Sequence, residues 1–227
     1  AFRTIPENIR SFEQLGLPRA LREFCYLSNG LVLVTGPTGS GKSTTLAALI
    51  DYINEKRNEH VITIEDPIEF VHAPRNCIVN QREVHRDTKS FARALRAALR
   101  EDPDIVLIGE MRDLETMEVA IETAETGHLV FATLHTNSAA STVERMIDKF
   151  PTHRQNQIRS MLADTLKGVV AQTLCKKIEG GRVAAFEVLV VTTPVSALLR
   201  EAKTHMLPSV MQTGRNVGMQ PFSDELT

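Results

Sequence analysis

Short apolar runs of strand length alternate, through the first two thirds of the chain, with segments whose apolar residues recur at helical spacing. The expected strands cover residues 31–34, 61–64, 105–108 and 129–134. The expected helices cover two short segments within 9–29, then 43–57, 87 or 88 to 100, and 115–125. The strand at 105–108 is apolar throughout, which is typical of a parallel sheet buried on both faces. The alternation predicts an α/β fold in which helices flank a mainly parallel central sheet.

The pattern changes after Pro151, where we expect one long helix over 153–171. The apolar side of this helix is formed by Ile158, Leu162, Leu166, Val169 and Val170. A Gly-Gly pair at 180–181 indicates a hairpin. Its strands are expected at 173–178 and 182–191, with short helices after them at 194–202 and 206–212. We therefore divide the chain into a core over 9–150 and a C-terminal helical and hairpin subregion of the same domain over 151–227.

Residues 36–44 fit the phosphate-loop pattern at every fixed position, between an expected strand and an expected helix. The candidate binding residues in this loop are Gly36, Pro37, Thr38, Gly39, Ser40, Gly41, Lys42, Ser43 and Thr44. Glycines let the backbone wrap closely around an anion, and the positive end of the following helix attracts phosphate. Lys42 brings a positive charge to the β- and γ-phosphates, and the Ser43 hydroxyl can bind Mg²⁺. The sequence predicts a protein that binds a nucleoside triphosphate.

Reactive side chains follow three of the expected strands. Glu65, Asp66 and Glu69 follow residues 61–64, Glu110 follows 105–108, and His135 follows 129–134. Ligands of open α/β sheets bind beyond the C-terminal ends of the strands. Triphosphate hydrolysis needs an acid for Mg²⁺ or its waters, a carboxylate that orients the attacking water, and a group that senses the γ-phosphate. A glycine stands where the usual metal-binding aspartate would follow its strand, so we assign the next residue, Glu110, to Mg²⁺ through a water molecule.

His128 and His135 lie at the two ends of one expected strand. Seven residues of extended chain place them ~23 Å apart, so they cannot share a metal ion. His135 lies at the edge where a nucleotide would bind, and His128 lies at the opposite edge. A structural role for His128 is as well supported by this geometry as a functional one.

Arg93, Arg96 and Arg100 share one face of an expected helix. The pattern fits a solvated stripe, and it also fits a subunit interface in which arginines face the acids or the nucleotide of a neighbour. The sequence alone leaves both interpretations open.

Length, charge and composition limit the number of domains and the kinds of partner that the chain can have. A chain of 227 residues that is 42% hydrophobic suits one α/β domain, or one domain with a small appendage. The net charge of −2 and the absence of Trp argue against nucleic acid as a direct partner. They therefore also argue against a nucleic-acid translocase, which would share the phosphate loop. No segment approaches the ~20 apolar residues that cross a bilayer, and no signal peptide is visible, so we expect a cytoplasmic protein.

Four ordered motifs carry a resemblance to a known family. They are residues 36–44, 62–69, 101–113 and 127–136. They resemble the Walker A motif, Asp box, Walker B motif and His box of the secretion ATPases of type II secretion and type IV pili. The resemblance implies a RecA-like P-loop NTPase fold, with ATP as the substrate and Mg²⁺ as its metal ion.

The resemblance also implies roles for individual residues. Glu69 and Glu110 would act in water activation and metal handling, together with Lys42, and His135 would contact the γ-phosphate region. His128 belongs to the His box, so the resemblance, unlike the strand geometry, assigns it to the nucleotide site. Glu65 and Asp66 belong to the Asp box and carry the same assignment.

The family's assembly is expected here as well. The resemblance implies a homo-hexameric ring whose ATP sites lie between subunits and are completed by arginines of a neighbour's N-terminal PAS-like domain. We interpret residues 1–8 as a linker from that missing domain. The motor would act on a platform protein of the inner membrane, and would therefore lie peripherally on that membrane.

Two departures from the family pattern bear on the kind of motor. The chain has no CxxC pair of the zinc insertion that assembly and secretion members carry, which favours a retraction-type motor that powers twitching motility. Residues 193–201 lack the first arginine of the family's retraction segment. A paralogue of the retraction motor, or another secretion ATPase with an accessory role, is therefore an alternative. A non-hydrolysing, nucleotide-gated interaction module is the alternative of a different class.

Overall fold

A central β-sheet organises the protein. The structure is a computed structural model that describes residues 8–178 and 180–224. Within these residues the strands form one seven-stranded sheet in the order β3-β2-β4-β5-β1-β6-β7. The strands are β1 (Gly30–Thr35), β2 (His60–Glu65), β3 (Ile78–Glu83), β4 (Ile105–Ile108), β5 (Leu129–Leu134), β6 (Leu166–Lys176) and β7 (Arg182–Val190). Neighbouring strands from β3 to β6 pair in parallel, and β7 pairs antiparallel with β6. The prediction of a mainly parallel α/β sheet is confirmed.

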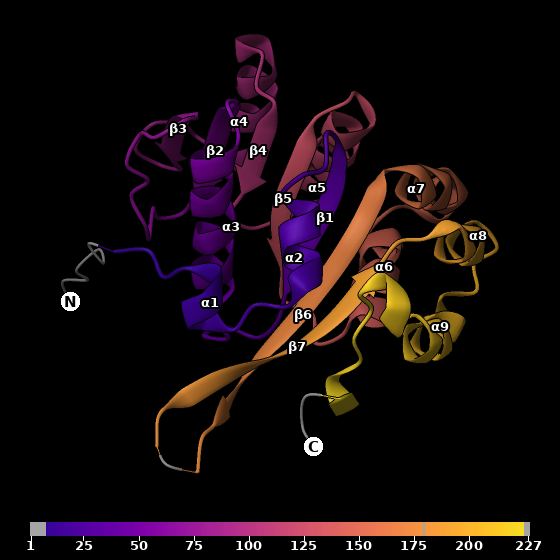
Figure 1. The fold of residues 1–227 in the computed structure, drawn as a ribbon. Helices are drawn as coiled ribbons and strands as arrows, with labels where there is room; N and C mark the ends of the chain where they lie inside the picture. The colour runs from indigo at the N-terminus through magenta and orange to yellow at the C-terminus, as the bar shows by residue number, and fades with distance from the viewer. Residues whose placement is uncertain (1–7, 179, 225–227) are drawn as a thin grey trace.

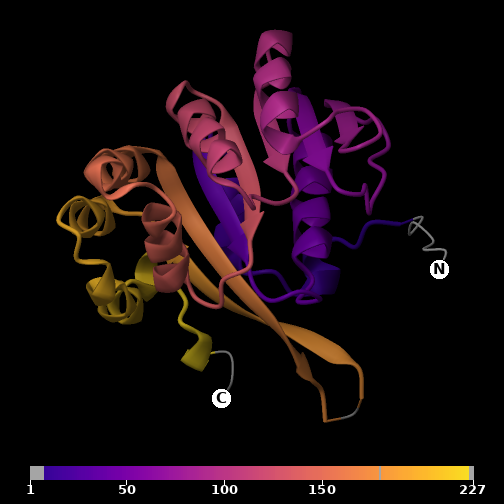
Figure 2. The same cartoon turned by 180° about the vertical axis from the view of Figure 1, so that it is seen from behind.

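Helices cover both faces of this sheet, as Figures 1 and 2 show from opposite sides. The helices are α1 (Phe12–Leu15), α2 (Arg19–Phe24), α3 (Lys42–Lys56), α4 (Phe91–Ala98), α5 (Leu114–Glu125), α6 (Ala139–Asp148), α7 (Thr152–Thr165), α8 (Thr193–Arg200) and α9 (Leu207–Thr213). On one face, buried residues of α1, α2 and α3 pack against the strands. On the other face, α4, α5, α6 and α7 pack on the sheet, and α8 and α9 extend this core. Strands β1, β4 and β5 are buried at every position because they have helices on both sides.

The long helix expected over 153–171 is wrong for residues 166–171. Helix α7 ends at Thr165, and residues 166–171 belong to β6, which pairs with β1. Val169 and Val170 are fully buried on opposite faces of the sheet, in different parts of the core. A strand with both faces buried has a continuous apolar run, which also continues the apolar side of the preceding helix.

Two elements were not predicted. Strand β3 lies at the edge of the sheet and has only exposed and half-buried residues, so its sequence lacks the apolar run of the inner strands. Helix α6 is polar on average and begins at a capping box formed by Ser138 and Ser141. The helix expected from residue 87 or 88 begins later, because Ser90 is its N-cap.

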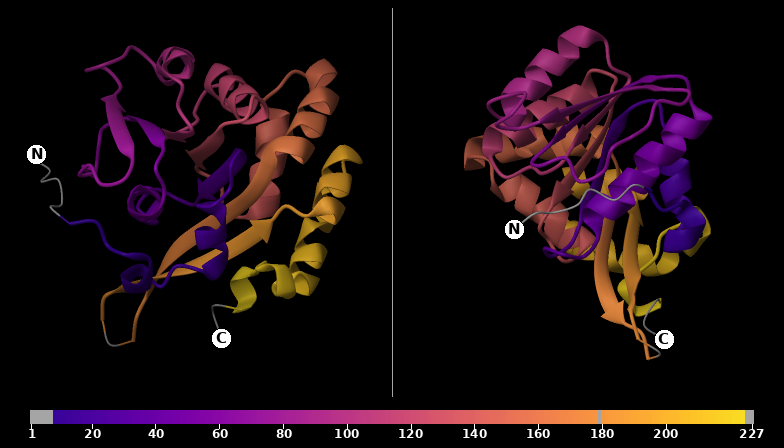
Figure 3. Two further views of the ribbon diagram at one scale, coloured as in Figure 1. Left: turned by 45° about the horizontal axis from the view of Figure 1, so that its top comes forward. Right: turned by 90° about the vertical axis from the view of Figure 1, so that its left-hand side faces the viewer.

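The C-terminal subregion contains the expected hairpin and short helices. Strands β6 and β7 extend beyond the rest of the sheet, as Figure 3 shows from two directions. Helices α8 and α9 begin and end within a residue or two of the expected bounds. The linker expected at residues 1–8 lies, apart from Asn8, outside the described residues.

Gly168 allows α2 to pack closely on β6. A Cβ atom at this position would lie 2.2 Å from Cζ of Phe24, which is buried against the strand. We expect Gly168→Ala to lower the free energy of unfolding by about 1–3 kcal/mol, because overpacking a core forces side chains and backbone apart. Equilibrium denaturation measures the change, and adding Phe24→Leu should recover part of the loss. An unchanged free energy of unfolding in Gly168→Ala would contradict this packing.

Candidate nucleotide-binding site

The phosphate loop joins β1 to α3 and is shaped by its glycines. Gly36, Gly39 and Gly41 have φ angles of 146°, 79° and 91°, which residues with a side chain rarely adopt. A Cβ atom on Gly36 would lie 2.3 Å from the carbonyl oxygen of Gln172 in β6. The side chain of Gln172 also donates a 2.7 Å hydrogen bond from Nε2 to the Ser40 carbonyl. The loop is therefore held against β6 as well as by its own turn.

Lys42 is the first residue of α3, and its side chain is largely buried. Its Nζ donates hydrogen bonds to the carbonyl oxygens of Gly36, at 2.8 Å, and Pro37, at 3.1 Å. Burial lowers the pKa of Lys42, and the negative charges of Glu110 and Glu69 oppose that shift. Carbonyls of the loop thus hold the ammonium next to the start of α3, where phosphate is attracted by free backbone N–H groups.

Glu110 is held between Arg112 and His135 just after the end of β4. Its Oε1 lies 2.9 Å from Nε2 of His135, and its Oε2 lies 2.6 Å from a guanidinium nitrogen of Arg112. Partial burial raises the pKa of Glu110, but the hydrogen bond and charge of Arg112 and the charge of His135 outweigh burial, so the pKa lies below its ordinary value. His135 also lies close to Lys42, with 3.4 Å between Nδ1 and Nζ. Lys42, Glu110 and His135, which the sequence predicted as site residues, therefore form one cluster.

Backbone contacts between β4 and β5 fix this cluster. The Met111 N–H donates to the Thr133 carbonyl at 3.0 Å, and the Thr133 hydroxyl donates to the Gly109 carbonyl at 2.5 Å. The Gly109 N–H donates in turn to the Ile64 carbonyl at 2.7 Å. The turn that carries Glu110 is therefore tied to the strands on both sides of it.

Glu65, at the end of β2, is the most enclosed acid of the site. Burial raises its pKa, although Thr63 and Gln81 donate hydrogen bonds to Oε1 at 2.7 and 3.1 Å and thereby oppose the shift. Asp66 and Glu69 follow in the loop between β2 and β3 and line the same cavity.

These groups surround a cavity of about 570 Å³ at the C-terminal edge of the sheet. Its lining includes most of the predicted site residues: Thr38, Gly39, Gly41, Lys42, Ser43, Thr44, Glu65, Asp66, Glu69, Glu110 and His135. A positively charged loop on one wall and carboxylates on the opposite wall suit a triphosphate with its metal ion.

Some predicted residues lie elsewhere. Gly36, Pro37 and Ser40 belong to the loop but do not line this cavity. His128 precedes β5, and its Nδ1 lies 3.1 Å from the carbonyl of Thr123. Within one chain His128 therefore lies at the other end of β5 from His135 and does not line the cavity, and its assignment to the nucleotide site stays a prediction.

The arginines at 93, 96 and 100 are exposed on α4 and its 3₁₀ extension, and they do not line the cavity. Arg96 pairs with Glu115 of α5. The sequence did not predict the contacts that Arg112 and Gln81 make with acids of the site. Arg112 could have been found from its position two residues after Glu110, whereas nothing in the sequence pattern indicates that Gln81 reaches Glu65.

The described residues do not form a metal site by themselves, so a metal ion would bind here together with the phosphates of a nucleotide. Within residues 8–178 and 180–224, no group of three or more His, Cys, Asp and Glu side chains could hold a metal ion. Mg²⁺ that is bound to phosphates takes only one or two protein oxygens and keeps several waters. The Ser43 hydroxyl and the ionised Glu110 carboxylate line the cavity and fit that donor set.

In the part of the chain that the structure describes, no helix is both long and apolar enough to cross a membrane.

The order of strand, glycine-rich loop and helix, with acids at the ends of β2 and β4, defines a phosphate-loop nucleotide-binding protein. Comparison with known families matches residues 6–181 to the family described as type II/IV secretion system protein. The chain belongs to this family.

Individual proteins similar to this chain agree with this family assignment. The chain is 57% identical over 219 residues to the type IV pilus retraction ATPase PilT of Pseudomonas aeruginosa, covering 96% of this chain and 64% of that protein. It is 53% identical to the twitching motility protein of Neisseria gonorrhoeae, covering 99% of this chain and 60% of that protein. A crystal structure of the pilus retraction motor PilT with bound ADP superimposes with a TM-score of 0.91 at 56% identity, covering 93% of this chain and 62% of that chain. The fold is thus the RecA-like fold of these ATPases, and the chain spans less than two thirds of the length of these relatives.

Arg112 gives a testable consequence of the Glu110 cluster. Because the folded-state pKa of Glu110 is lowered, its ionised form stabilises the fold above the ordinary pKa, and this contribution is lost as the pH falls towards the folded-state pKa. We expect Arg112→Gln to raise the pKa of Glu110 towards its ordinary value and to reduce the loss of stability on acidification. Carboxyl NMR titration measures the pKa. Arg96→Gln, which removes an arginine paired with a distant glutamate, is the control, and an unchanged Glu110 pKa in Arg112→Gln would contradict the geometry.

Proposed function

We propose that this chain is the ATP-hydrolysing region of a hexameric motor that powers type IV pilus retraction. The observation that carries the proposal is the convergence of Lys42, Glu69, Glu110 and His135 on one cavity beside the start of α3. The relatives named for pilus retraction and twitching motility support the biological role.

Binding of ATP begins with the phosphate loop. Backbone N–H groups of the loop and of the first turn of α3 hold the phosphates, and Lys42 exchanges its bonds to the Gly36 and Pro37 carbonyls for phosphate oxygens. The carbonyls already hold the ammonium beside the cavity, so the exchange needs little movement of the side chain.

Hydrolysis needs a water molecule oriented towards the γ-phosphate. Glu69 supplies the carboxylate that accepts a hydrogen bond from this water, and it lies near enough to Lys42 for their charges to interact. His135 reaches the terminal phosphate from β5 and reports its presence to Glu110 through the 2.9 Å contact between Nε2 and Oε1. The hydrolysis of ATP is in this way linked to the ends of β2, β4 and β5.

Ser43 and Glu110 would hold Mg²⁺, Ser43 by its hydroxyl and Glu110 through a water molecule. The ion would neutralise negative charge that develops on the β- and γ-phosphates. Arg112 keeps Glu110 ionised for this task, since its guanidinium lowers the pKa of the carboxyl.

The assembly is part of the same proposal. A ring of six copies would place an N-terminal domain of one subunit against the cavity of the next, supply arginines to it, and transmit movement to an inner-membrane platform protein from the cytoplasmic side. His128 and the exposed arginines of α4 are free of the cavity within one chain, so contact with a neighbouring subunit is the role that we propose for them.

The charged cavity favours hydrolysis over a module that only binds nucleotide. A binding module needs the phosphate loop, but it does not need carboxylates placed opposite that loop on two further strands. Restored retraction in cells would separate the retraction motor from a paralogue with an accessory role.

We expect Glu69→Gln and Glu110→Gln each to lower kcat for ATP hydrolysis by the full-length protein about 10²- to 10³-fold, as removal of one transition-state contact does. Phosphate release measures turnover, and fluorescent-nucleotide titration should show that both variants still bind ATP.

Lys42→Ala should lose binding as well as turnover, and should not restore twitching motility to cells that lack the protein. Glu115→Gln, which alters an exposed glutamate of α5, is the matched control. Unchanged hydrolysis in Glu110→Gln would remove its assignment, and absence of hydrolysis in the unaltered protein would favour the binding module.

A further inference from the structure

The loop between β2 and β3 carries Asp66 and Glu69 into the cavity, yet it has no helix or strand of its own. A carboxylate that orients water must be held to within a fraction of an ångström, since a misplacement of about 1 Å can cost about 10²-fold in rate. The loop therefore needs other structure to hold it. Side chains of its neighbouring elements supply this support.

Gln81 lies in β3, and its side-chain amide forms hydrogen bonds with the half of the loop that carries Glu69. Its Nε2 donates hydrogen bonds to the Phe70 carbonyl at 2.8 Å and to Glu65 Oε1 at 3.1 Å. Its Oε1 accepts a hydrogen bond from the His72 N–H at 2.9 Å. One side chain thus binds the loop backbone directly after Glu69 and also the acid that ends β2.

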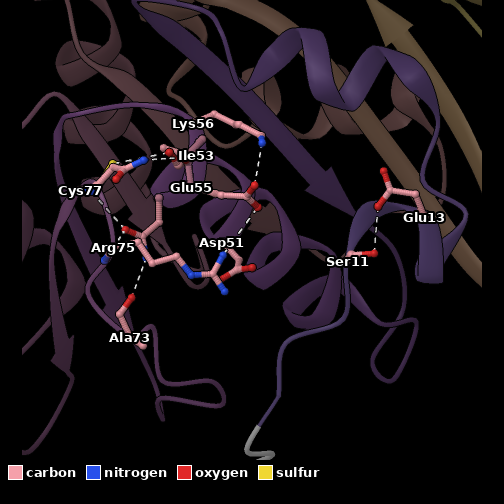
Figure 4. A network of polar contacts seen from close by, with 11 residues as sticks. Ser11, Glu13, Asp51, Ile53, Glu55, Lys56, Ala73, Arg75 and Cys77 are labelled. Carbon is pink, nitrogen blue, oxygen red and sulfur yellow. Dashed lines mark hydrogen bonds and ion pairs between the residues drawn. The ribbon is translucent and has the colours of Figure 1, made fainter.

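The other half of the loop is held separately, at the C-terminal end of α3. The buried side chain of Asn54 donates to the Ala73 carbonyl at 2.8 Å and accepts from the N–H groups of Arg75 and Cys77, each at 3.2 Å. Figure 4 shows Cys77 next to Ile53 near the end of this helix, with Arg75 and then Ala73 further away. Asn54 therefore anchors the loop away from the cavity. The half that carries Glu69 is held by Gln81 and by Glu83, which accepts a 3.0 Å hydrogen bond from the Ile68 N–H.

A glutamine suits this position because the loop presents both donors and acceptors to it. The Phe70 carbonyl and the Glu65 carboxylate need donors, and the His72 N–H needs an acceptor. Leucine offers neither, and glutamate offers acceptors only and adds a negative charge beside Glu65. Asn80, the preceding residue, points to the other face of the strand and contacts His60, with 2.9 Å between Nδ2 and Nε2.

We propose that Gln81 is a positioning residue for ATP hydrolysis, which fixes the segment from Glu65 to His72 so that Glu69 faces the nucleotide. The inference rests on the proposed hydrolysis for its kinetic consequence. Its structural consequence, a loop held by Gln81, is independent of any activity.

Gln81→Leu and Gln81→Glu test the proposal in the full-length protein. We expect kcat to fall about tenfold to hundredfold, with KM for ATP changing less than about threefold, because nucleotide binding depends on the phosphate loop. Because Gln81 acts through Glu69, combining Gln81→Leu with Glu69→Gln should lower kcat no further than Glu69→Gln alone. Asn80→Ala, which removes an amide from the other face of β3, should leave kcat unchanged.

Hydrogen exchange of the nucleotide-free protein provides the second readout. We expect backbone amides of residues 68–72 to exchange at least about tenfold faster in both Gln81 variants, with the amides of β1 and β4 unchanged. Unchanged exchange in the loop, an unchanged kcat, or additive effects with Glu69→Gln would overturn the proposal. Loss of folding in both variants would also overturn it, since Gln81 would then support the whole core. If the unaltered protein does not hydrolyse ATP, the proposed function fails, while the exchange comparison still decides the role of Gln81.

Discussion

The ammonium of Lys42 is held by carbonyl oxygens of its own loop and faces carboxylates that arrive from two other strands. This placement depends on the glycines that turn the backbone back over the end of β1 and on the close approach of Gly36 to β6. Burial lowers the pKa of Lys42, and the opposing charges of Glu110 and Glu69 reduce this shift without cancelling it. An anion that enters the cavity meets a cation already in position.

The parallel sheet explains why groups so distant in sequence meet here. Strands β1, β2, β4 and β5 are paired in register, so their C-terminal ends share one edge, and each end delivers a loop with a reactive side chain. Helix α3 adds a second connection, because it begins at Lys42 and carries Asn54 in its last turn, and Asn54 binds the far half of the loop that carries Glu69. Gln81 holds the near half. The loop between β2 and β3, on the side of the cavity opposite the phosphate loop, is thus held in both its halves.

The sequence alone predicted β1, β2, β4 and β5 and the residues that follow them, because strands buried on both faces are continuous apolar runs and the motifs follow their ends. It did not predict β3, since an edge strand needs no such run. Residues 166–171 fit both a helix and a strand, and pairing with β1 decides between them. Arg112 and Gln81 contact residues of other elements, so their roles depend on distances that only the fold supplies. For His128, strand length predicted a position at the far end of β5 from His135, and the role that the resemblance assigns to it stays a prediction.

A structure of the full-length protein with Mg²⁺ and a non-hydrolysable ATP analogue tests the arrangement most directly. The terminal phosphate should lie within hydrogen-bonding distance of Lys42, which will have left the carbonyls of Gly36 and Pro37. Glu69 should contact the water in line with that phosphate, and Glu110 should lie next to the ion. A nucleotide bound with its terminal phosphate remote from Glu69, Glu110 and His135 would contradict the role of this cavity in hydrolysis.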